Sequence, residues 1–324
     1  MLDSQGRNID YLRVSVTDRC NMRCIYCMPS HGVEWKPHDT ILSFEDTLKI
    51  CNILANMGIR KVKVTGGEPL VRRGCTDFIK NLKNITGIEE VTLTTNGLLL
   101  NDYLHEIADT LDGINISLDS LDRTRYHAIS GSDGLDIVLS AIERVLKAGI
   151  KVKINVVPIL GLNEEDIIPL AGLAKNKNIH VRFIELMPLG LAGTYKPVLG
   201  KEIAAKIESF HGKLIPFDTA GESRAGESRS LGNGPAKYYS IEGFKGKIGF
   251  INAMTDCFCV NCNRIRLTSV GILKPCLGSE QGTDLKPFLK TGSDLEKVLF
   301  KTIFNKQIKH SFTGLEEGMF RVGG

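Results

Sequence analysis

The segment that decides the fold reads Thr17-Asp-Arg-Cys20-Asn-Met-Arg-Cys24-Ile-Tyr-Cys27-Met28. It follows directly on residues 11–17, a short β-branched and apolar segment that predicts a buried strand. The spacing C-x3-C-x2-C places three thiols in one short loop after that strand. Three thiolates can hold three irons of a cubane cluster, and the fourth iron then has no protein ligand. An open metal position is typical of a catalytic centre rather than a structural one.

Strand-like and helix-like segments alternate outward from this loop through the first two thirds of the chain. Short Val-, Ile- and Thr-rich strands are predicted at 11–17, 61–65, 90–95, 113–118, 151–157 and 180–186. The residues Ser43 to Asp46 read as a capping box, and Asn163 reads as the N-cap of a further helix. Six such units predict a parallel sheet, either doubly wound or rolled into a partial barrel, with the active site at the strand C-termini.

The alternation ends near residue 210. Residues 220–229 repeat Ala-Gly-Glu-Ser-Arg twice, which predicts a loop. Short strands are then predicted at 237–241, 247–252 and 264–269, and helices near 284–290 and 294–309. We therefore expect two parts, a sheet-and-helix domain at 1–210 and a smaller module at 211–324.

Composition and charge exclude several classes of protein. The 324 residues are 42% hydrophobic and 24% charged, as in ordinary globular proteins, and the net charge of +4 is too small to imply nucleic-acid binding. No apolar run is long enough to cross a membrane, and the first ten residues lack a signal-peptide pattern, so we expect a cytoplasmic protein. Nine cysteines, an odd number, argue against a complete disulfide framework.

A second motif, Val64-Thr-Gly-Gly-Glu-Pro69, follows the second predicted strand. Its glycines allow close approach of backbone to a ligand, and Glu68 can accept from an ammonium group. A structural zinc site or a chance grouping of thiols would explain the cysteine loop alone. The two motifs together, with Tyr26 before the third cysteine, resemble the radical S-adenosylmethionine (SAM) superfamily. There the amino and carboxylate groups of SAM chelate the open iron, and electron transfer into the sulfonium releases a 5′-deoxyadenosyl radical.

Three further cysteines stand near the C-terminus, with the spacing C-x2-C-x13-C: Cys259, Cys262 and Cys276. A second cluster with an open iron explains three thiols well. A zinc site with Cys257 as the fourth ligand remains an alternative. Arg264 and Arg266 alternate on a predicted strand beside this group, and two guanidiniums suggest a polyanionic substrate.

The two cysteine groups, the run Asn263-Arg-Ile-Arg266 and a terminal Gly-Gly pair resemble the GTP 3′,8-cyclase family of molybdenum cofactor biosynthesis over essentially the whole chain. The resemblance implies an α/β fold, an incomplete (β/α)6 TIM-like barrel with a C-terminal α+β iron–sulfur module. It implies two 4Fe–4S clusters, SAM as cofactor and an external electron donor. In that family the adenosyl radical takes a hydrogen from the ribose C3′ of GTP, and the ribosyl radical attacks guanine C8. The product, 3′,8-cyclo-7,8-dihydroguanosine 5′-triphosphate, passes to a cyclic pyranopterin monophosphate synthase, and a homodimer is plausible.

The same resemblance implies roles for individual residues. The catalytic cluster ligands are Cys20, Cys24 and Cys27, and the second cluster has Cys259, Cys262 and Cys276. The expected SAM contacts are Tyr26, Gly67, Ser117 and Met187. The expected GTP contacts are Arg13, Lys63, Thr94, Lys153, Arg264, Ile265 and Arg266. Lys63 departs from a position that is often arginine, and so loses the bidentate fork. Gly323 and Gly324 match a tail that enters the active site.

Other interpretations exist for these residues and for the chain. The lysines at strand alternation can be solvated, the hydroxyls of Thr94 and Ser117 can satisfy loop amides, and Met187 can be core packing. The competing functions are another radical SAM enzyme with an auxiliary cluster, such as a peptide-modifying one, and an iron–sulfur electron carrier or zinc-stabilised binding module. The electron carrier has no need for the Thr-Gly-Gly-Glu-Pro motif.

Overall fold

The computed structural model describes residues 1–32, 37, 40–217, 231–232, 234–279, 281–291, 294–310, 312 and 318–322. The repeat at 220–229 and the tail pair Gly323 and Gly324 lie outside these residues. In the described part, one sheet runs in the order β12-β11-β10-β1-β2-β3-β4-β5-β6-β9-β8-β7. Its two end strands, β12 and β7, are not paired with each other, so the sheet is open, as the expected partial barrel requires.

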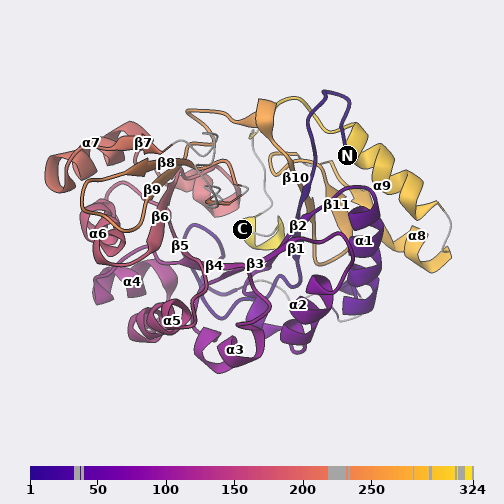
Figure 1. Cartoon of the computed structure of the whole chain (residues 1–324), viewed down its shortest axis with the longest axis horizontal. Coiled ribbons are helices and arrows are strands. Elements are labelled where there is room, and N and C mark those ends of the chain that lie inside the picture. The colour runs from indigo at the N-terminus through magenta and orange to yellow at the C-terminus, as the bar shows by residue number, and fades with distance from the viewer. Residues whose placement is uncertain are drawn as a thin grey trace, which may run out of the picture.

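All six predicted strands are present and pair in parallel in chain order. They are β1 (Tyr11–Ser15), β2 (Lys61–Thr65), β3 (Glu90–Thr95), β4 (Gly113–Ser117), β5 (Val152–Val156) and β6 (Ile179–Ile184). Figure 1 shows these strands curving round the centre of the molecule, with the connecting helices outside the curve. Parallel strands covered on their outer face are buried, which explains their Val- and Ile-rich sequences.

The helices that cover this sheet lie between its strands in chain order. They are α1 (Phe44–Asn56), α2 (Cys75–Lys83), α3 (Leu100–Ile107), α4 (Arg123–Ser130), α5 (Leu135–Lys147), α6 (Ile167–Asn176) and α7 (Gly200–His211), with both α4 and α5 between β4 and β5. Helix α1 begins as predicted, because the Ser43 side chain accepts from the Asp46 backbone N–H at 2.9 Å. It buries Ile50 and Leu54 completely against the sheet.

Asn163 stands at the predicted start of its helical segment, but its side chain does not cap it. It occupies the N-cap position of a 3-10 turn, Glu164–Asp166, which leads directly into α6 at Ile167, and its side chain makes no capping hydrogen bond. Its amide is buried and instead accepts from Ile159 N at 2.7 Å and donates to the Asp119 carbonyl at 2.8 Å. Asn163 therefore joins the loops after β4 and β5, a long-range role that its local sequence does not reveal.

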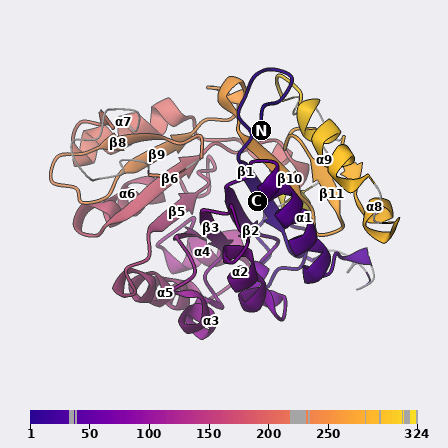
Figure 2. The same cartoon turned by 45° about the vertical axis from the view of Figure 1, so that its right-hand side comes forward.

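The C-terminal segment adds strands to both edges of the six-stranded core. β9 (Ile248–Ile251) pairs in parallel with β6, and β10 (Arg264–Leu267) pairs in parallel with β1. The remaining elements are β7 (Ile215–Phe217), β8 (Lys237–Ser240), β11 (Ile272–Lys274), β12 (Thr283–Asp284), α8 (Lys286–Thr291), α9 (Leu295–Phe304) and α10 (Met319–Val322). Figures 1 and 2 show α8 and α9 on the side of α1, with α10 inside the curve of the sheet.

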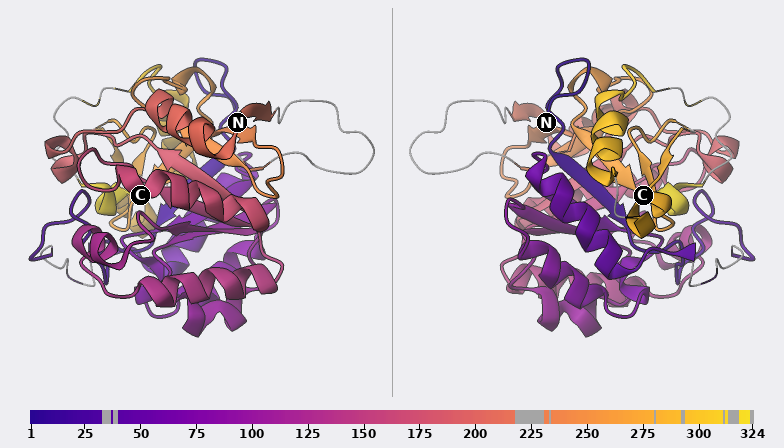
Figure 3. Two further views of the ribbon diagram at one scale, coloured as in Figure 1. Left: turned by 90° about the vertical axis from the view of Figure 1, so that its left-hand side faces the viewer. Right: turned by 90° about the vertical axis from the view of Figure 1, so that its right-hand side faces the viewer.

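In two side views, α7 and α9 lie in the upper part of the molecule, whereas α2, α3 and α5 form its lower part (Figure 3). Both edges of the core sheet are thus extended by strands that lie far away in sequence. In the described part of the chain, no helix has the length and the apolar character needed to cross a membrane.

Candidate active site

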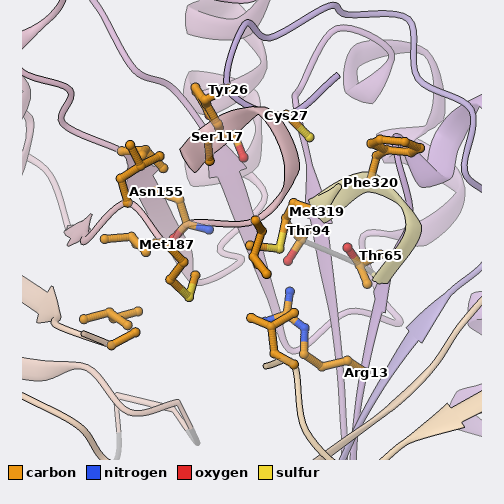
Figure 4. A pocket seen from close by; sticks show the side chains of 18 of the residues that line it. Arg13, Tyr26, Cys27, Thr65, Thr94, Ser117, Asn155, Met187, Met319 and Phe320 are labelled. Atoms are coloured by element: carbon orange, nitrogen blue, oxygen red, sulfur yellow. The ribbon is translucent and has the colours of Figure 1, made fainter. Parts of the chain in front are cut away.

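Both cysteine groups line a single cavity of ≈ 290 Å³ inside the curve of the sheet. The cysteines that line it are Cys20, Cys24, Cys27, Cys259, Cys262 and Cys276. Figure 4 shows Tyr26, Ser117 and Cys27 at one end of this pocket and Arg13 at the other, with Met319 of α10 between them. The two groups, more than 230 residues apart in sequence, meet because β10 pairs with β1.

The first cysteine loop is held by backbone contacts with the loop after β2. Gly67 N donates to Thr17 O at 2.7 Å, and Glu68 N donates to Arg19 O at 2.8 Å. A Cβ on Gly66 would lie 2.8 Å from Thr17 O, and one on Gly67 would lie 2.4 Å from Arg19 O. The two glycines are therefore required for the packing of one loop on the other. The sequence suggested a different reason for them, the close approach of backbone to a ligand.

Glu68 is fully buried and already has three donors. It accepts from Leu70 N at 3.1 Å, from Thr95 Oγ1 at 2.8 Å and from Asn96 N at 2.7 Å. Burial raises the pKa of Glu68 to about 7, against the lowering effect of these hydrogen bonds. The carboxylate thus joins the loops after β2 and β3, and it is not among the residues that line the cavity, where the predicted contact with an ammonium group would be made.

Tyr26 is held at the cavity wall by a buried carboxylate that the sequence did not single out. Its hydroxyl donates to Asp119 Oδ2 at 2.6 Å, and the other oxygen of Asp119 accepts from Val157 N at 2.8 Å. Burial raises the pKa of Asp119 to about 6. Asp119 follows β4 directly, so it links the cysteine loop to the C-terminal ends of β4 and β5.

The second cysteine group surrounds a buried lysine. The ammonium of Lys306 donates to Arg264 O at 2.9 Å and to Pro275 O, next to Cys276. Burial raises the pKa of the Cys262 thiol, but Arg264 and Lys306 outweigh it and hold this pKa at about 7, below its ordinary value. A lysine within the C-terminal helix region gave no sequence signal for this role.

The N-terminal segment fastens this region from outside. Arg7 is paired with Asp3, with 2.6 Å between Nε and Oδ2, and both side chains are buried. Its guanidinium also donates to the carbonyls of Cys259, Lys306 and Gln307 at 2.9, 3.0 and 2.9 Å. One side chain thus holds the second cysteine loop and the chain after α9 in one position.

A row of cations crosses the sheet beside the cavity. The strand register aligns Arg13 with Arg266 on one side and with Lys63 on the other. All three line the cavity, and Lys63 and Arg266 are buried. Because neighbouring strands lie about 4.8 Å apart, the register brings three positive side chains close together.

Burial and the charges of neighbouring cations lower the pKa values of these three side chains. The pKa of Lys63 and that of Arg266 lie well below their ordinary values, first because of burial and then because of neighbouring cations. The pKa of Arg13 falls to about 10 for the same reasons. A ligand with several negative charges offsets the repulsion among these cations, so such a cluster favours the binding of a polyanion.

Arg182 on β6 is a cation that the sequence interpretation missed. It is buried, lines the cavity and donates to Asn115 Oδ1 at 2.6 Å and to Asn155 Oδ1 at 2.9 Å through Nη2 and Nε. An arginine within a predicted strand gives no local signal.

The remaining predicted residues fall in three places. Thr94, Ser117, Met187 and Gly67 line the main cavity, as do Tyr26 and Arg264. Lys153 lines an adjoining cavity of ≈ 260 Å³ that shares Lys63 and Arg182 with the first. Ile265 is fully buried in the hydrophobic core on the other face of β10, so its side chain does not line either cavity.

Helix α10 enters the cavity from the C-terminal end of the described chain. Met319 and Phe320 line the cavity, and Arg266 Nη1 donates to Val322 O at 3.2 Å. The predicted entry of Gly323 and Gly324 into the site concerns residues outside the described ones.

Both cysteine groups have the surroundings that iron–sulfur ligation needs. Cys20 Sγ accepts from Met22 N at 3.4 Å and from Asn96 Nδ2 at 3.7 Å, and Arg264 Nη2 lies 4.0 Å from Cys262 Sγ. Burial raises the pKa of Cys20 to about 11, so metal binding there releases a proton. N–H groups directed at sulfur stabilise a cluster and tune its potential. The residues present therefore fit two clusters.

Comparison with known proteins agrees with this geometry. Residues 14–174 match the model of the Radical SAM superfamily, and residues 179–312 match that of Molybdenum Cofactor Synthesis C. The structure of Streptococcus suis SuiB bound to S-adenosylmethionine aligns with a TM-score of 0.63 at 16% identity, over 92% of this chain and 67% of that one. This last likeness concerns the fold alone.

Curated relatives match the whole chain. GTP 3′,8-cyclase of Clostridium perfringens (strain SM101 / Type A) is 44% identical over 100% of both chains. The enzyme of the same name from Thermodesulfovibrio yellowstonii is 42% identical over 94% of both. With full-length identity at this level and both cysteine groups in one cavity, the chain belongs to the GTP 3′,8-cyclase family of the radical SAM superfamily.

Proposed function

We propose that this chain converts GTP to 3′,8-cyclo-7,8-dihydroguanosine 5′-triphosphate, with SAM and two 4Fe–4S clusters as cofactors. The observation that carries the proposal is the buried cation row of Arg13, Lys63 and Arg266 inside the cavity that both cysteine groups line. A nucleoside triphosphate carries several negative charges on one group, which suits three neighbouring cations. Both cysteine groups line the same cavity as these cations.

The first cluster, when bound at Cys20, Cys24 and Cys27, supplies the one-electron chemistry that makes the hydrogen-abstracting radical from SAM. Tyr26, Gly67, Ser117 and Met187 are proposed SAM contacts. Asp119 keeps Tyr26 in place through its 2.6 Å hydrogen bond. The burial of this end of the cavity excludes water, which protects a reactive species from side reactions.

The proposed triphosphate contacts are Arg13, Lys63, Lys153 and Arg182, of which Arg182 is added by the structure. Lys63 and Arg182 line both cavities, and Lys153 extends the positive surface into the second. Arg264 and Arg266 stand on one face of β10, next to Cys262, and are proposed to hold the nucleoside end near the second cluster. Thr94 completes the proposed contacts, and Ile265 contributes through its backbone. Clamping of both ends orients the ribose, which is the main contribution of the chain to catalysis.

The deciding experiment is an anaerobic assay with reconstituted protein, GTP, SAM and dithionite. We expect 5′-deoxyadenosine and the cyclised nucleotide in equal amounts, separated by liquid chromatography and identified by mass. Formation of 5′-deoxyadenosine without GTP turnover would refute the cyclase assignment. A peptide-modifying activity would appear in the same way, as radical formation independent of GTP.

The cellular setting is proposed on chemical grounds. None of the nine cysteines forms a disulfide, and oxygen-sensitive cluster ligands suit a reducing compartment, so we place the protein in the cytoplasm. An external electron donor reduces the first cluster, and a cyclic pyranopterin monophosphate synthase takes the product. Neither nucleic acid nor membrane is a proposed partner, and a homodimer is the proposed assembly.

A further inference from the structure

Cys257 lies beside the second cysteine group but does not line the cavity. Its sulfur, the sulfur of Cys259 and a ring nitrogen of His310 all lie within 4.8 Å of one another. His310 is distant in sequence, and the same Arg7 guanidinium that binds Cys259 O also reaches the Ile308 carbonyl, which brings the two segments together. Two thiols and one imidazole at this separation suit one metal ion, whereas the ligands of a cubane each bind a different iron.

The imidazole of His310 is fixed in a metal-binding tautomer. Its Nε2 lies 3.0 Å from the carbonyl oxygen of Ala253, which can only accept, so Nε2 carries the hydrogen. In the neutral ring Nδ1 then has a free lone pair, and this atom is buried without a hydrogen-bond partner. A ring N–H bound to a backbone carbonyl is the usual support of a histidine that ligates metal through its other nitrogen.

The ring is also held by packing. His310 and Phe312 have centroids 4.3 Å apart, and both pack over Gly278. A Cβ on Gly278 would lie 2.9 Å from His310 Cβ and 2.9 Å from a ring carbon of Phe312. Cys259 Sγ in turn accepts from the backbone N–H of His310, so the thiol and the imidazole are tied together.

We propose that Cys257, Cys259 and His310 form a site for one zinc-class divalent ion, with the fourth position open to water. Cys259 is also a ligand of the second cluster. Zinc at the tripod of Cys257, Cys259 and His310 and a complete cluster at Cys259, Cys262 and Cys276 therefore exclude one another. The zinc site stands on the geometry alone, and only the exclusion rests on the proposed function.

The binding test uses the full chain with its iron removed anaerobically and Zn²⁺ or Co²⁺ as the probe. We expect about one tightly bound zinc per chain, with X-ray absorption showing two sulfur ligands and at least one imidazole. Cys257→Ser and His310→Gln should each abolish this binding. Cys262→Ser and Cys276→Ser are the matched controls, and both should retain it.

Each variant is first checked for native circular dichroism, so that loss of zinc is not loss of fold. Zinc bound through three or four sulfurs in the wild-type chain, or zinc lost in the Cys262→Ser and Cys276→Ser controls, would overturn the proposal. These outcomes do not depend on whether GTP is the substrate.

The exclusion is tested by reconstitution of the zinc-loaded chain with iron and sulfide. We expect about four irons per chain instead of about eight, and about eight again in Cys257→Ser. Uptake of eight irons with zinc retained would show that the two sites do not compete.

Discussion

Lys153 is partly buried among other cations, and this environment disfavours the charged form of its side chain when no ligand is bound. Burial, followed by the charge of Arg182, lowers its pKa to about 8 from the ordinary value of 10.5. The shift corresponds to about 3 kcal/mol of lost stability at pH 7. We expect Lys153→Met to raise the free energy of unfolding by up to this amount, while GTP binding weakens. Urea unfolding and GTP titration of the SAM-loaded enzyme measure the two effects.

The exposed Lys147 on α5 provides the control. Lys147→Met should leave both quantities unchanged, since a solvated charge contributes little. If Lys153→Met destabilises the chain, or leaves GTP affinity as it was, Lys153 is a structural residue instead of a phosphate contact.

Because Glu68 is buried, we expect it to lower the free energy of unfolding as the pH rises. Most carboxylates in folded proteins have the opposite effect. The folded pKa of Glu68, about 7, lies above the unfolded value of 4.5, so the folded state binds the proton more tightly. The contribution of Glu68 to the free energy of unfolding is fully present below pH 4.5. It is lost as the pH rises to about 7, by about 1.4 kcal/mol per pH unit. The difference in unfolding free energy between the wild type and Glu68→Gln should follow this slope between pH 4.5 and 7. Parallel curves would show that hydrogen bonding, and not burial, controls this carboxyl.

Site residues that belong to a distinctive motif, such as the cysteines, could be predicted from the sequence. Site residues of common types that stand outside any motif could not. Cys20 and Cys259 belong to spacings that few folds need, so their motifs predicted their meeting in one cavity. Arg182 alternates with apolar residues in its strand, as a solvent-exposed arginine also does. Its hydrogen bond to Asn115 joins residues 67 positions apart in sequence. The role of Asp119 likewise depends on Tyr26, 93 residues away. Such pairs are set by tertiary packing, which a local pattern does not contain.

The N-terminal segment acts as a fastening element for the second cysteine loop. Arg7→Met leaves the carboxylate of Asp3 buried without its ion pair and removes the hydrogen bonds to Cys259 O, Lys306 O and Gln307 O. Loss of one partner of a buried pair costs about 3 kcal/mol or more. We therefore expect lower stability to urea and a selective loss of the second cluster, measured by iron content and electron paramagnetic resonance.

Arg123 and Asp136 form a comparison pair whose side chains are 70% and 63% exposed. Arg123→Met should change the unfolding free energy by about 0.5 kcal/mol or less and leave the iron content intact. If Arg7→Met behaves in the same way, the segment before β1 is not part of the cluster support.

Regular elements of the sheet were predicted well, and their partners less well. Short Val-, Ile- and Thr-rich segments located β1 to β6, and the Ser43 capping signal located the start of α1, because buried strands and helix starts leave local marks in the sequence. The same patterns placed β9 and β10 near their true positions. They did not indicate that these strands pair with β6 and β1, since the register of distant strands depends on the whole fold.

At the scale of the molecule, this pairing makes the two parts of the chain depend on each other. In a fragment of residues 1–210, β1 and β6 become open edges, and the side chains of Leu12 and Phe183 lose part of their cover. Long unpaired edges beside apolar surface promote aggregation. We expect the fragment to be insoluble alone and soluble when residues 211–324 are co-expressed, as judged by size-exclusion chromatography.

A monodisperse fragment 1–210 with a cooperative thermal transition would show that the first part folds by itself and that the second is an appended module. Aggregation instead identifies the sheet as the common folding unit. The cation row then forms only when β10 docks, because Arg266 takes its place beside Arg13 through that pairing. Assembly of the second cysteine group and completion of the anion-binding surface are, on this view, a single folding event. A chain that fails to dock β10 should therefore lose GTP binding and the second cluster together.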